Sequence, residues 1–315
     1  PVTIRRMKPS LLIVGCGNVA RRALPSLIER YRVLATYRDP AQAAALRAAG
    51  AIPVYADLDQ PATLTRLAGL ASRLLYTAPP AAQGERDPRV AHLIAALKRR
   101  SMLPQHLVYI STTGVYGDCG GAWVDETRTP APDSPRGKRR LDAERQWRRA
   151  AQSGGVSLSI LRVPGIYAID RLPVERVMSG SPVLQADEDN YGNHIHADDL
   201  AGLIVAALAR YQGGIRVFNA CDNFPLPTGT WLECVAAFAH LPPLPRLPRA
   251  ALQQVVSPAL WSFLRESRRV SNQRIRHELR YPLRYPDVGV FFTAHAPCRS
   301  CFGAPEGEGV GLGRV

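Results

Sequence analysis

The feature that most constrains this chain is the stretch from Leu11 to Ala20, LLIVGCGNVA, in which a strand-length apolar run ends at a glycine-rich turn. An amphipathic helical pattern over residues 18–30 follows immediately. Gly15 permits a tight turn, Gly17 lets a phosphate approach the backbone, and the small Ala20 allows close packing of helix on strand. The free N–H groups at the start of such a helix attract anions. The order favours a dinucleotide site over a plain strand-to-helix turn, with predicted contacts from Gly15, Gly17, Asn18, Val19 and Ala20.

Short apolar runs rich in β-branched residues alternate with longer helical patterns over the first half of the chain. This alternation is typical of a parallel sheet covered by helices on both faces. The patterns predict strands at 11–14, 33–37, 53–55, 73–76, 107–111 and 158–162, and helices at 18–30, 40–49, 60–69, 87–100 and 137–153. Right-handed crossovers then give an α/β fold, a doubly wound parallel sheet of the Rossmann type, whose ligands bind at the carboxyl ends of the strands.

The alternation of strand and helix patterns ends after Arg162, where a Pro/Gly loop is followed by mainly helical patterns. They predict helices near 173–179, 197–210, 228–239 and 249–266, a strand at 215–218 and an extended connector at 242–248. We therefore expect a dinucleotide-binding domain at 1–165 and a small, mainly helical substrate-binding region at 166–293, packed beside the cofactor site. The Gly-rich segment 294–315 has few large apolar residues and is predicted to be a disordered tail.

The net charge of +14 raises the question of nucleic-acid binding, yet only three of the 40 basic residues are lysines. The basic residues occur singly or in pairs along helices and form no stripe interleaved with aromatic side chains, so no nucleic-acid partner is expected. A basic surface would still favour phosphorylated ligands.

The six cysteines are scattered and do not resemble the disulfide framework of a small secreted protein, so a cytoplasmic location is expected. No stretch reaches the roughly 18 uninterrupted apolar residues of a membrane helix, and no membrane association is predicted. Cys298 and Cys301 form one isolated pair without a second ligand pair, so no metal site is expected.

Arg38 follows the second predicted strand, at the position where an NAD-preferring site usually carries an acidic residue for the ribose 2′-hydroxyl. An arginine there can bind a 2′-phosphate, which favours NADP over NAD. The alternative is a solvated surface arginine in an arginine-rich chain.

Several short motifs follow the glycine turn in a fixed order: Asp57-Leu58, the segment Ser111 to Gly117 (STTGVYG), Leu161 to Tyr167 (LRVPGIY) and Ile195 to Ala201 (IHADDLA). In this order they resemble the extended and atypical short-chain dehydrogenases/reductases, the superfamily of nucleotide-sugar epimerases and dehydratases. The resemblance covers about residues 10–290. It implies NADP or NAD as cofactor, a small-molecule substrate, and further cofactor contacts from Asp57, Leu58, Ala78, Pro79, Arg140 and Pro164.

In that superfamily a Ser or Thr after the fifth strand polarises the substrate oxygen, and Thr112 falls on this position. A Tyr, helped by a Lys four residues later, carries the proton while hydride moves to or from the nicotinamide. Aligning the segment around Gly137 puts Arg136 at the Tyr position and Arg140 at the Lys position. An arginine cannot shuttle protons near neutral pH, so the usual dyad is replaced. Arg140 can still hold the cofactor, or the two arginines simply face solvent at a helix start.

Tyr167 and His194 are the candidates for a substitute acid beside Thr112. His194 and His196 lie two residues apart and should face the same side of a strand, although His196 corresponds to a mainly structural residue in the superfamily. The acidic residues of the dehydratases are missing, since Thr113 and Gly114 occupy their place. Gly192 stands where many epimerases place an arginine for a diphosphate. Both departures weaken the prediction of a nucleotide-sugar substrate.

Two functions remain open from the sequence. The first is an NAD(P)-dependent oxidoreductase or epimerase acting on a small carbonyl, hydroxyl or sugar-type substrate, with Thr112, Tyr167 and His194 as catalytic candidates. The second is a non-catalytic NADP-binding sensor or interaction module that has lost the dyad. A homodimer through the helices at 87–100 and 137–153 is expected from the superfamily.

Overall fold

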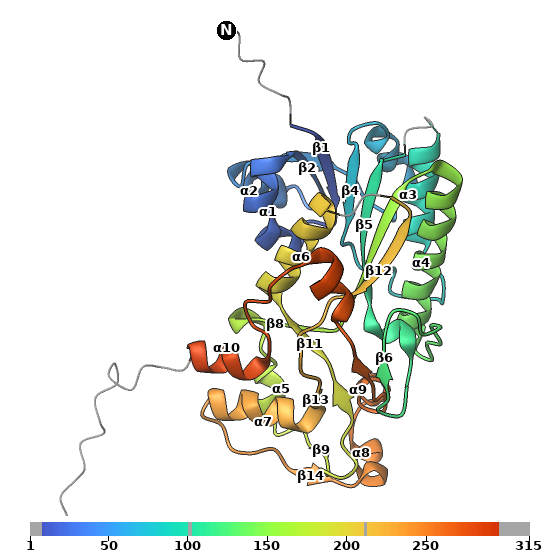
Figure 1. The fold of residues 1–315 in the computed structure, drawn as a ribbon. Helices are drawn as coiled ribbons and strands as arrows, with labels where there is room; N and C mark the ends of the chain where they lie inside the picture. The colour runs from blue at the N-terminus through green and yellow to red at the C-terminus, as the bar shows by residue number, and fades with distance from the viewer. Residues whose placement is uncertain (1–7, 100–102, 211–212, 296–315) are drawn as a thin grey trace, which may run out of the picture.

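Seven parallel strands form the central sheet of the protein, in the order β12-β7-β5-β4-β1-β2-β3 (Figure 1). The structure is a computed structural model that describes residues 8–99, 103–210 and 213–295. The strands are β1 (Ser10–Val14), β2 (Arg32–Tyr37), β3 (Ile52–Tyr55), β4 (Arg73–Tyr76), β5 (His106–Thr112), β7 (Ser157–Val163) and β12 (Ile215–Asn219). Each neighbouring pair is parallel, which confirms the predicted doubly wound α/β fold.

Helices cover both faces of this sheet because its strands are apolar on both sides. One face carries α1 (Asn18–Arg30), α2 (Ala41–Ala48) and α6 (Ala197–Arg210), and the other carries α3 (Pro88–Lys98) and α4 (Pro135–Gly154) (Figure 1). Along β1, Leu11 and Ile13 join the core under α1 and α6, whereas Leu12 and Val14 join the core under α3 and α4. Successive side chains of this apolar strand therefore pack into two separate cores, one on each face of the sheet.

The order of the strands reverses between β1 and β4, which lie side by side in the sheet. The chain leaves β1 for α1 on one face and leaves β4 for α3 on the other. The loops after these strands therefore diverge and open a crevice at the carboxyl edge of the sheet, the usual ligand position in doubly wound folds.

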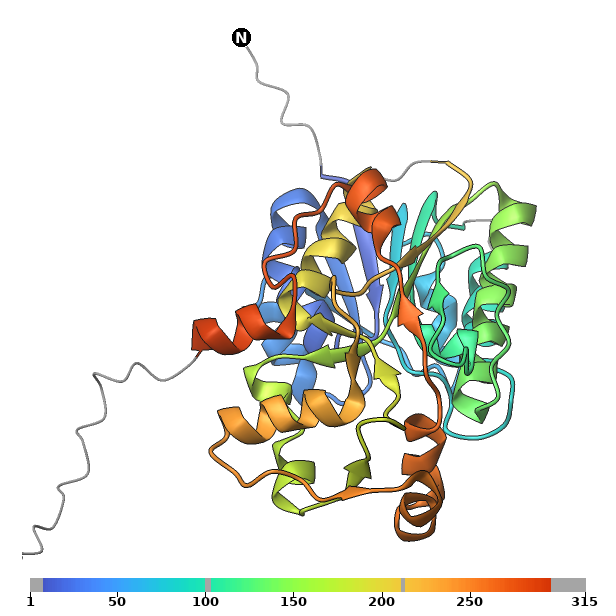
Figure 2. The ribbon, with the colours of Figure 1, turned by 60° about the horizontal axis from the view of Figure 1, so that its bottom comes forward.

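The remaining elements lie below the carboxyl ends of the strands, as both views of the ribbon show (Figures 1 and 2). Short strands pair β8 (Gly165–Tyr167) with β11 (His194–His196), β9 (Val183–Leu184) with β14 (Arg246–Leu247), β10 (Tyr191–Gly192) with β13 (Leu226–Pro227), and β6 (Trp123–Val124) with β15 (Arg269–Val270). The helices are α5 (Val174–Met178), α7 (Thr228–Phe238), α8 (Arg249–Val255), α9 (Pro258–Leu264) and α10 (Val288–His295), with single turns at Thr113–Tyr116, Ile169–Arg171 and Ile275–Leu279. This part of the chain borders the crevice from below, with Tyr191, Thr228 and Phe263 among the residues that line its cavities.

The central sheet draws on residues beyond position 165, where the sequence suggested a domain boundary. β12 pairs with β7, with Val217 opposite Ile160, and α6 packs against α1. The apolar Phe218 is fully buried in the core under α6. Burial of this strand and helix explains why the chain returns to the sheet after first leaving it. The division into 1–165 and 166–293 remains a prediction.

Two predicted helices differ from the structure. The pattern over 249–266 forms α8 and α9 instead of one helix, because Pro258 lacks an N–H and Ser257 caps the second helix by accepting a hydrogen bond from the Leu260 N–H (3.2 Å). The segment predicted at 60–69 forms a 3₁₀-helix over Pro61–Leu67. The predicted tail falls almost wholly at 296–315, outside the described residues. Among the helices described, none is both long and apolar enough to cross a membrane.

Candidate functional site

Three neighbouring cavities follow the carboxyl edge of the sheet. The first, of about 560 Å³, lies between the glycine turn and the ends of β2, β3 and β4. The second, of about 220 Å³, shares Gly15, Gly17, Asn18 and Thr77 with the first and reaches Thr112. The third, of about 620 Å³, shares Thr112, Arg136 and Pro164 with the second and extends under α9. Together they form a continuous path from the glycine turn to the C-terminal part of the chain.

Every residue predicted to contact the cofactor lines the first or second cavity. These residues are Gly15, Gly17, Asn18, Val19, Ala20, Arg38, Asp57, Leu58, Ala78, Pro79, Arg140 and Pro164. They come from loops far apart in the sequence that meet because parallel strands end at the same edge. Their roles in binding remain a prediction.

The glycine turn has the geometry that a dinucleotide requires. Gly15 has a φ of +90°, and a Cβ added there would lie 2.5 Å from the backbone nitrogen of Ala78. Thr36 accepts a hydrogen bond from the Gly15 N–H (3.2 Å), and the Thr77 hydroxyl donates to the Gly15 carbonyl. A Cβ added at Gly17 would meet nothing within 4 Å, because this residue opens onto the cavities. The start of α1 therefore presents backbone N–H groups to the first and second cavities, where the sequence predicts the pyrophosphate.

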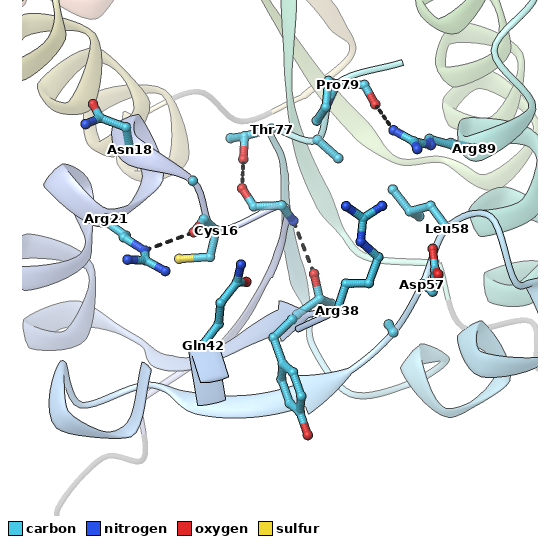
Figure 3. Close-up of a pocket in the computed structure, with 16 residues that line it drawn as sticks. Cys16, Asn18, Arg21, Arg38, Gln42, Asp57, Leu58, Thr77, Pro79 and Arg89 are labelled. Carbon is cyan, nitrogen blue, oxygen red and sulfur yellow. Dashed lines mark hydrogen bonds between the residues drawn. The ribbon is translucent and has the colours of Figure 1, made fainter. Parts of the chain in front are cut away.

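The far wall of the first cavity carries positive charge. Figure 3 shows the guanidinium of Arg38 lying between the glycine turn and Leu58. In the described part of the chain, no carboxylate lies within ion-pair distance of Arg38. The Arg21 side chain lines the same cavity and donates from Nε to the Cys16 carbonyl (3.2 Å). Arg89 also lines this cavity, but its guanidinium already forms an ion pair with Asp59 (2.5 Å).

Arg140 forms a buried wall of the second cavity. Its Nη1 donates to the carbonyl of Ile110 (3.0 Å) and to the Tyr109 hydroxyl (3.3 Å). Its Nε is buried and has no hydrogen-bond partner among the described residues. A cation fixed in this way at the end of β5 can hold an anion or a hydroxyl group of a ligand, the role predicted for this position.

Thr112 ends β5 at the wall shared by the second and third cavities. Its hydroxyl oxygen accepts a hydrogen bond from the Gly114 N–H (3.2 Å), which leaves the hydroxyl proton free to donate. Behind it, Ser111 donates to Glu144 (2.7 Å), and Glu144 forms a buried ion pair with Arg162 (2.8 Å). This network joins α4 to β5 and β7 and so sets where Thr112 and the start of α4 lie.

Tyr167 and His194 do not line any of the three cavities. Tyr167 is 1% exposed inside an aromatic cluster with Trp231 and Phe291, and burial, followed by the charge of Asp222, raises the pKa of its hydroxyl. The His194 ring lies on Trp231 (4.5 Å between centroids), and burial lowers its pKa to about 4. His194 and His196 both face Tyr167, as their spacing predicted. These contacts favour packing roles for both candidates and do not support a substitute acid beside Thr112.

Sequence reasoning missed several residues that line the cavities: Arg21, Thr36, Gln42, Arg89 and Arg171. Arg21 could have been found, because it lies one helical turn after Gly17 and must face the same side. Arg171 follows Asp170, which pairs with Arg22 of α1 (2.5 Å) and so brings its loop over the cavity. No local pattern marks that long-range contact.

The buried Asp222 gives a pH-dependent prediction. It is 2% exposed, one of its oxygens has no partner among the described residues, and burial, with Asp287 and Asp199 nearby, raises its pKa to about 8. Between about pH 4 and 8 the folded state therefore holds a proton that the unfolded chain releases, so this group makes stability fall as pH rises, by up to about 1.4 kcal/mol per pH unit.

We expect Asp222→Asn to remove this contribution. The variant should lose less stability than the parent between pH 5 and pH 8, as measured by urea unfolding at several pH values. Equal pH dependence in the two proteins would show that Asp222 ionises normally in the folded state.

The fold and the cavities define a dinucleotide-binding protein of the Rossmann type. The family model described as NAD(P)H-binding matches residues 15–210, and the chain belongs to this family. A comparison with curated proteins found no match. The solved structures with the same fold include epimerase/dehydratase-like and short-chain dehydrogenase/reductase proteins, as the motifs predicted.

Three solved structures illustrate the similarity. A functionally unknown conserved protein from Silicibacter pomeroyi is 32% identical, with a TM-score of 0.77 over 92% of this chain and 99% of that chain. A candidate NAD-dependent epimerase/dehydratase from Methylobacillus flagellatus is 24% identical, with a TM-score of 0.66 over 91% and 97% of the two chains. A short-chain dehydrogenase/reductase superfamily protein from Agrobacterium tumefaciens with bound NAD is 16% identical, with a TM-score of 0.71 over 91% and 96%.

Proposed function

We propose that this protein binds NADP and uses it in an oxidoreductase or epimerase reaction on a small carbonyl or hydroxyl compound held in the third cavity. The observation that carries the proposal is the position of Thr112, which lines both the second and the third cavity. A bound nicotinamide cofactor would supply the hydride acceptor or donor.

The chain's own residues have three tasks in this proposal. The glycine turn and the start of α1 hold the pyrophosphate through backbone N–H groups. Arg140 fixes the part of the cofactor that reaches the second cavity, and Pro164 borders it. Thr112 donates its hydroxyl proton in a hydrogen bond to the substrate oxygen, which stabilises the negative charge that develops there during reduction.

The first test measures dinucleotide binding and turnover together. Binding of NADPH at 100 times its dissociation constant should stabilise the protein by about 2.7 kcal/mol in thermal unfolding. NADPH oxidation should then be followed with a panel of ketones, aldehydes and keto sugars. Absence of stabilisation by either NADPH or NADH would contradict the proposed cofactor site.

Thr112→Ala should lower kcat/KM by roughly 10²–10³-fold, the usual effect of removing one donor to a developing oxyanion. NADPH affinity should stay within about twofold, because the turn that holds the pyrophosphate is untouched. Thr112→Ser keeps the hydroxyl and serves as the matched control. Equal losses in Thr112→Ala and Thr112→Ser would indicate a packing role for this residue.

Arg38→Ser should weaken NADPH binding by about tenfold or more, since one charge-assisted contact to the 2′-phosphate is lost. NADH binding should change little. Arg32→Ser is the control, because Arg32 is an exposed residue at the opposite end of β2 that lines none of the three cavities. A variant that loses NADPH and NADH affinity equally would argue against a 2′-phosphate at Arg38.

A second candidate is a protein that binds NADP without catalysing a reaction. The arginines at positions 136 and 140, together with the buried positions of Tyr167 and His194, support it. NADPH binding with no turnover across the panel, and no effect of Thr112→Ala on any ligand response, would favour this candidate.

A further inference from the structure

The start of α4 concentrates positive charge where the second and third cavities meet. Ser134 caps the helix, and its first turn contains no acidic residue. Arg136, Lys138, Arg139 and Arg140 follow within six residues of the cap. Cations at this end of a helix are opposed by the helix dipole, which favours anions there. The arrangement is unfavourable unless each cation finds a negative partner.

Three of these four cations have partners in the protein. Lys138 pairs with Glu85 (2.6 Å), Arg139 donates to the carbonyl of Gly84 (2.6 Å), and Arg140 donates to the carbonyl of Ile110 (3.0 Å). Arg136 differs from them. Within the described residues it has no ion-pair or hydrogen-bond partner, and its guanidinium lies 5.6 Å from the ring centroid of Phe263.

The lining of the third cavity carries a net positive charge, and Arg136 is exposed to solvent. Three arginines line it, namely Arg136, Arg139 and Arg268, and Glu266 is its single acidic lining residue. Glu266 is already paired with Arg268 (2.7 Å), so it cannot neutralise Arg136 as well. Desolvation, followed by the charges of Arg140 and Arg139, lowers the pKa of Arg136.

We propose that Arg136 binds an oxyanion of the substrate, a carboxylate or a phosphate, next to the reacting oxygen at Thr112. The third cavity carries the remainder of the molecule, with Phe263 and Tyr191 as apolar walls. The planar fork of an arginine matches the two oxygens of either anion. The residue that stands where the superfamily has its proton carrier thus selects the charge of the substrate.

The cofactor is a poorer source of this anion. Its pyrophosphate is expected at the start of α1, and its 2′-phosphate at Arg38. Arg140, one helical turn after Arg136, already faces the second cavity with a buried Nε that lacks a partner. Arg136 lies on the same helix face and borders the second cavity too, but unlike Arg140 it also lines the third cavity, which the cofactor is not expected to fill.

The test compares probes that carry an anionic group with related probes that lack the charge. Phenylpyruvate and its methyl ester form the carboxylate pair, and dihydroxyacetone phosphate and dihydroxyacetone form the phosphate pair. Binding is measured by calorimetry with saturating NADP, the oxidised form, which cannot reduce the keto probes, and again without it. The charged member of at least one pair should bind about tenfold tighter or more than its neutral partner, as expected for a bidentate charge-assisted contact. The pair that shows the preference identifies the anion.

Arg136→Met should remove that preference and leave NADPH affinity within about twofold, whereas Arg136→Lys should keep part of it. Arg145→Met is the matched control, because Arg145 is exposed on the same helix and lines none of the three cavities. Equal binding within both pairs, a preference that survives Arg136→Met, or an equal loss of NADPH affinity would overturn the inference.

This inference rests on the proposed function in one respect, namely that a substrate occupies the third cavity. The two can fail separately, because the titrations without NADP measure the anion site alone. If the parent protein binds no dinucleotide, the proposed cofactor is refuted. The charge preference of the probes, measured without NADP, would still decide the role of Arg136.

Discussion

Glu144→Ala is expected to destabilise the protein by roughly 3–5 kcal/mol, because it leaves the Arg162 guanidinium charged and unpaired inside the core. Glu144 is 1% exposed and Arg162 is 2% exposed. Glu144 accepts two hydrogen bonds from Arg162 (3.0 and 2.8 Å) and one from the Ser111 hydroxyl (2.7 Å).

Urea unfolding followed by circular dichroism measures this loss. Lys138→Met is the matched control, because Lys138 lies on the same helix and its ion pair with Glu85 (2.6 Å) is exposed. This exposed pair should contribute less than about 1 kcal/mol to stability. The double variant Glu144→Leu with Arg162→Met should recover most of the stability, because apolar groups replace both charges. A loss no greater than that of the control would mean that Arg162 finds another partner.

The same network ties stability to the site. α4 is held to β5 through Ser111 and to β7 through Arg162, and it presents Arg136 and Arg140 to the second cavity. A shift of the helix would move both cations relative to Thr112. Destabilised variants of Glu144 should therefore also bind dinucleotide and charged probes more weakly.

The fold was predictable because its signals are local and repeated. Each strand of the central sheet is an apolar run between turn residues, and the helical patterns between them fix the crossovers. The association of β12 with this sheet could not be predicted, since it depends on the register of Val217 against Ile160, which is far away in the sequence. The single helix predicted over 249–266 was wrong, although Pro258 is a local signal for the break because it lacks the N–H that a continuous helix needs.

The site was predictable to the extent that backbone geometry defines it. The glycine turn and the strand ends must meet at one edge of the sheet, so the predicted cofactor residues line one path. The catalytic candidates depended on the direction of single side chains. Thr112 reaches the cavities, but Tyr167 points into an aromatic cluster that includes Phe291 of α10, a contact across more than a hundred residues. Such packing has no local sequence signal.

Gly15→Ala and Gly17→Ala should separate the two tasks of the glycine turn. At Gly15 the φ of +90° is unfavourable for alanine by about 1–2 kcal/mol, and the new Cβ would lie 2.5 Å from the Ala78 nitrogen. Overpacking against backbone adds about 1–3 kcal/mol. We expect Gly15→Ala to lose stability and, because the turn must move, to lose dinucleotide affinity by about 100-fold or more, a change of roughly 2.7 kcal/mol.

Gly17→Ala should lose affinity without a comparable loss of stability. Its φ of −85° suits any residue, and a Cβ there would meet nothing within 4 Å, so the cost at this helix cap should be about 1 kcal/mol. The methyl group would nonetheless occupy the open space at the start of α1, where the pyrophosphate is expected. Thermal unfolding and NADPH titration of both variants measure the two effects. Unchanged NADPH affinity in Gly17→Ala would mean that no phosphate approaches this backbone.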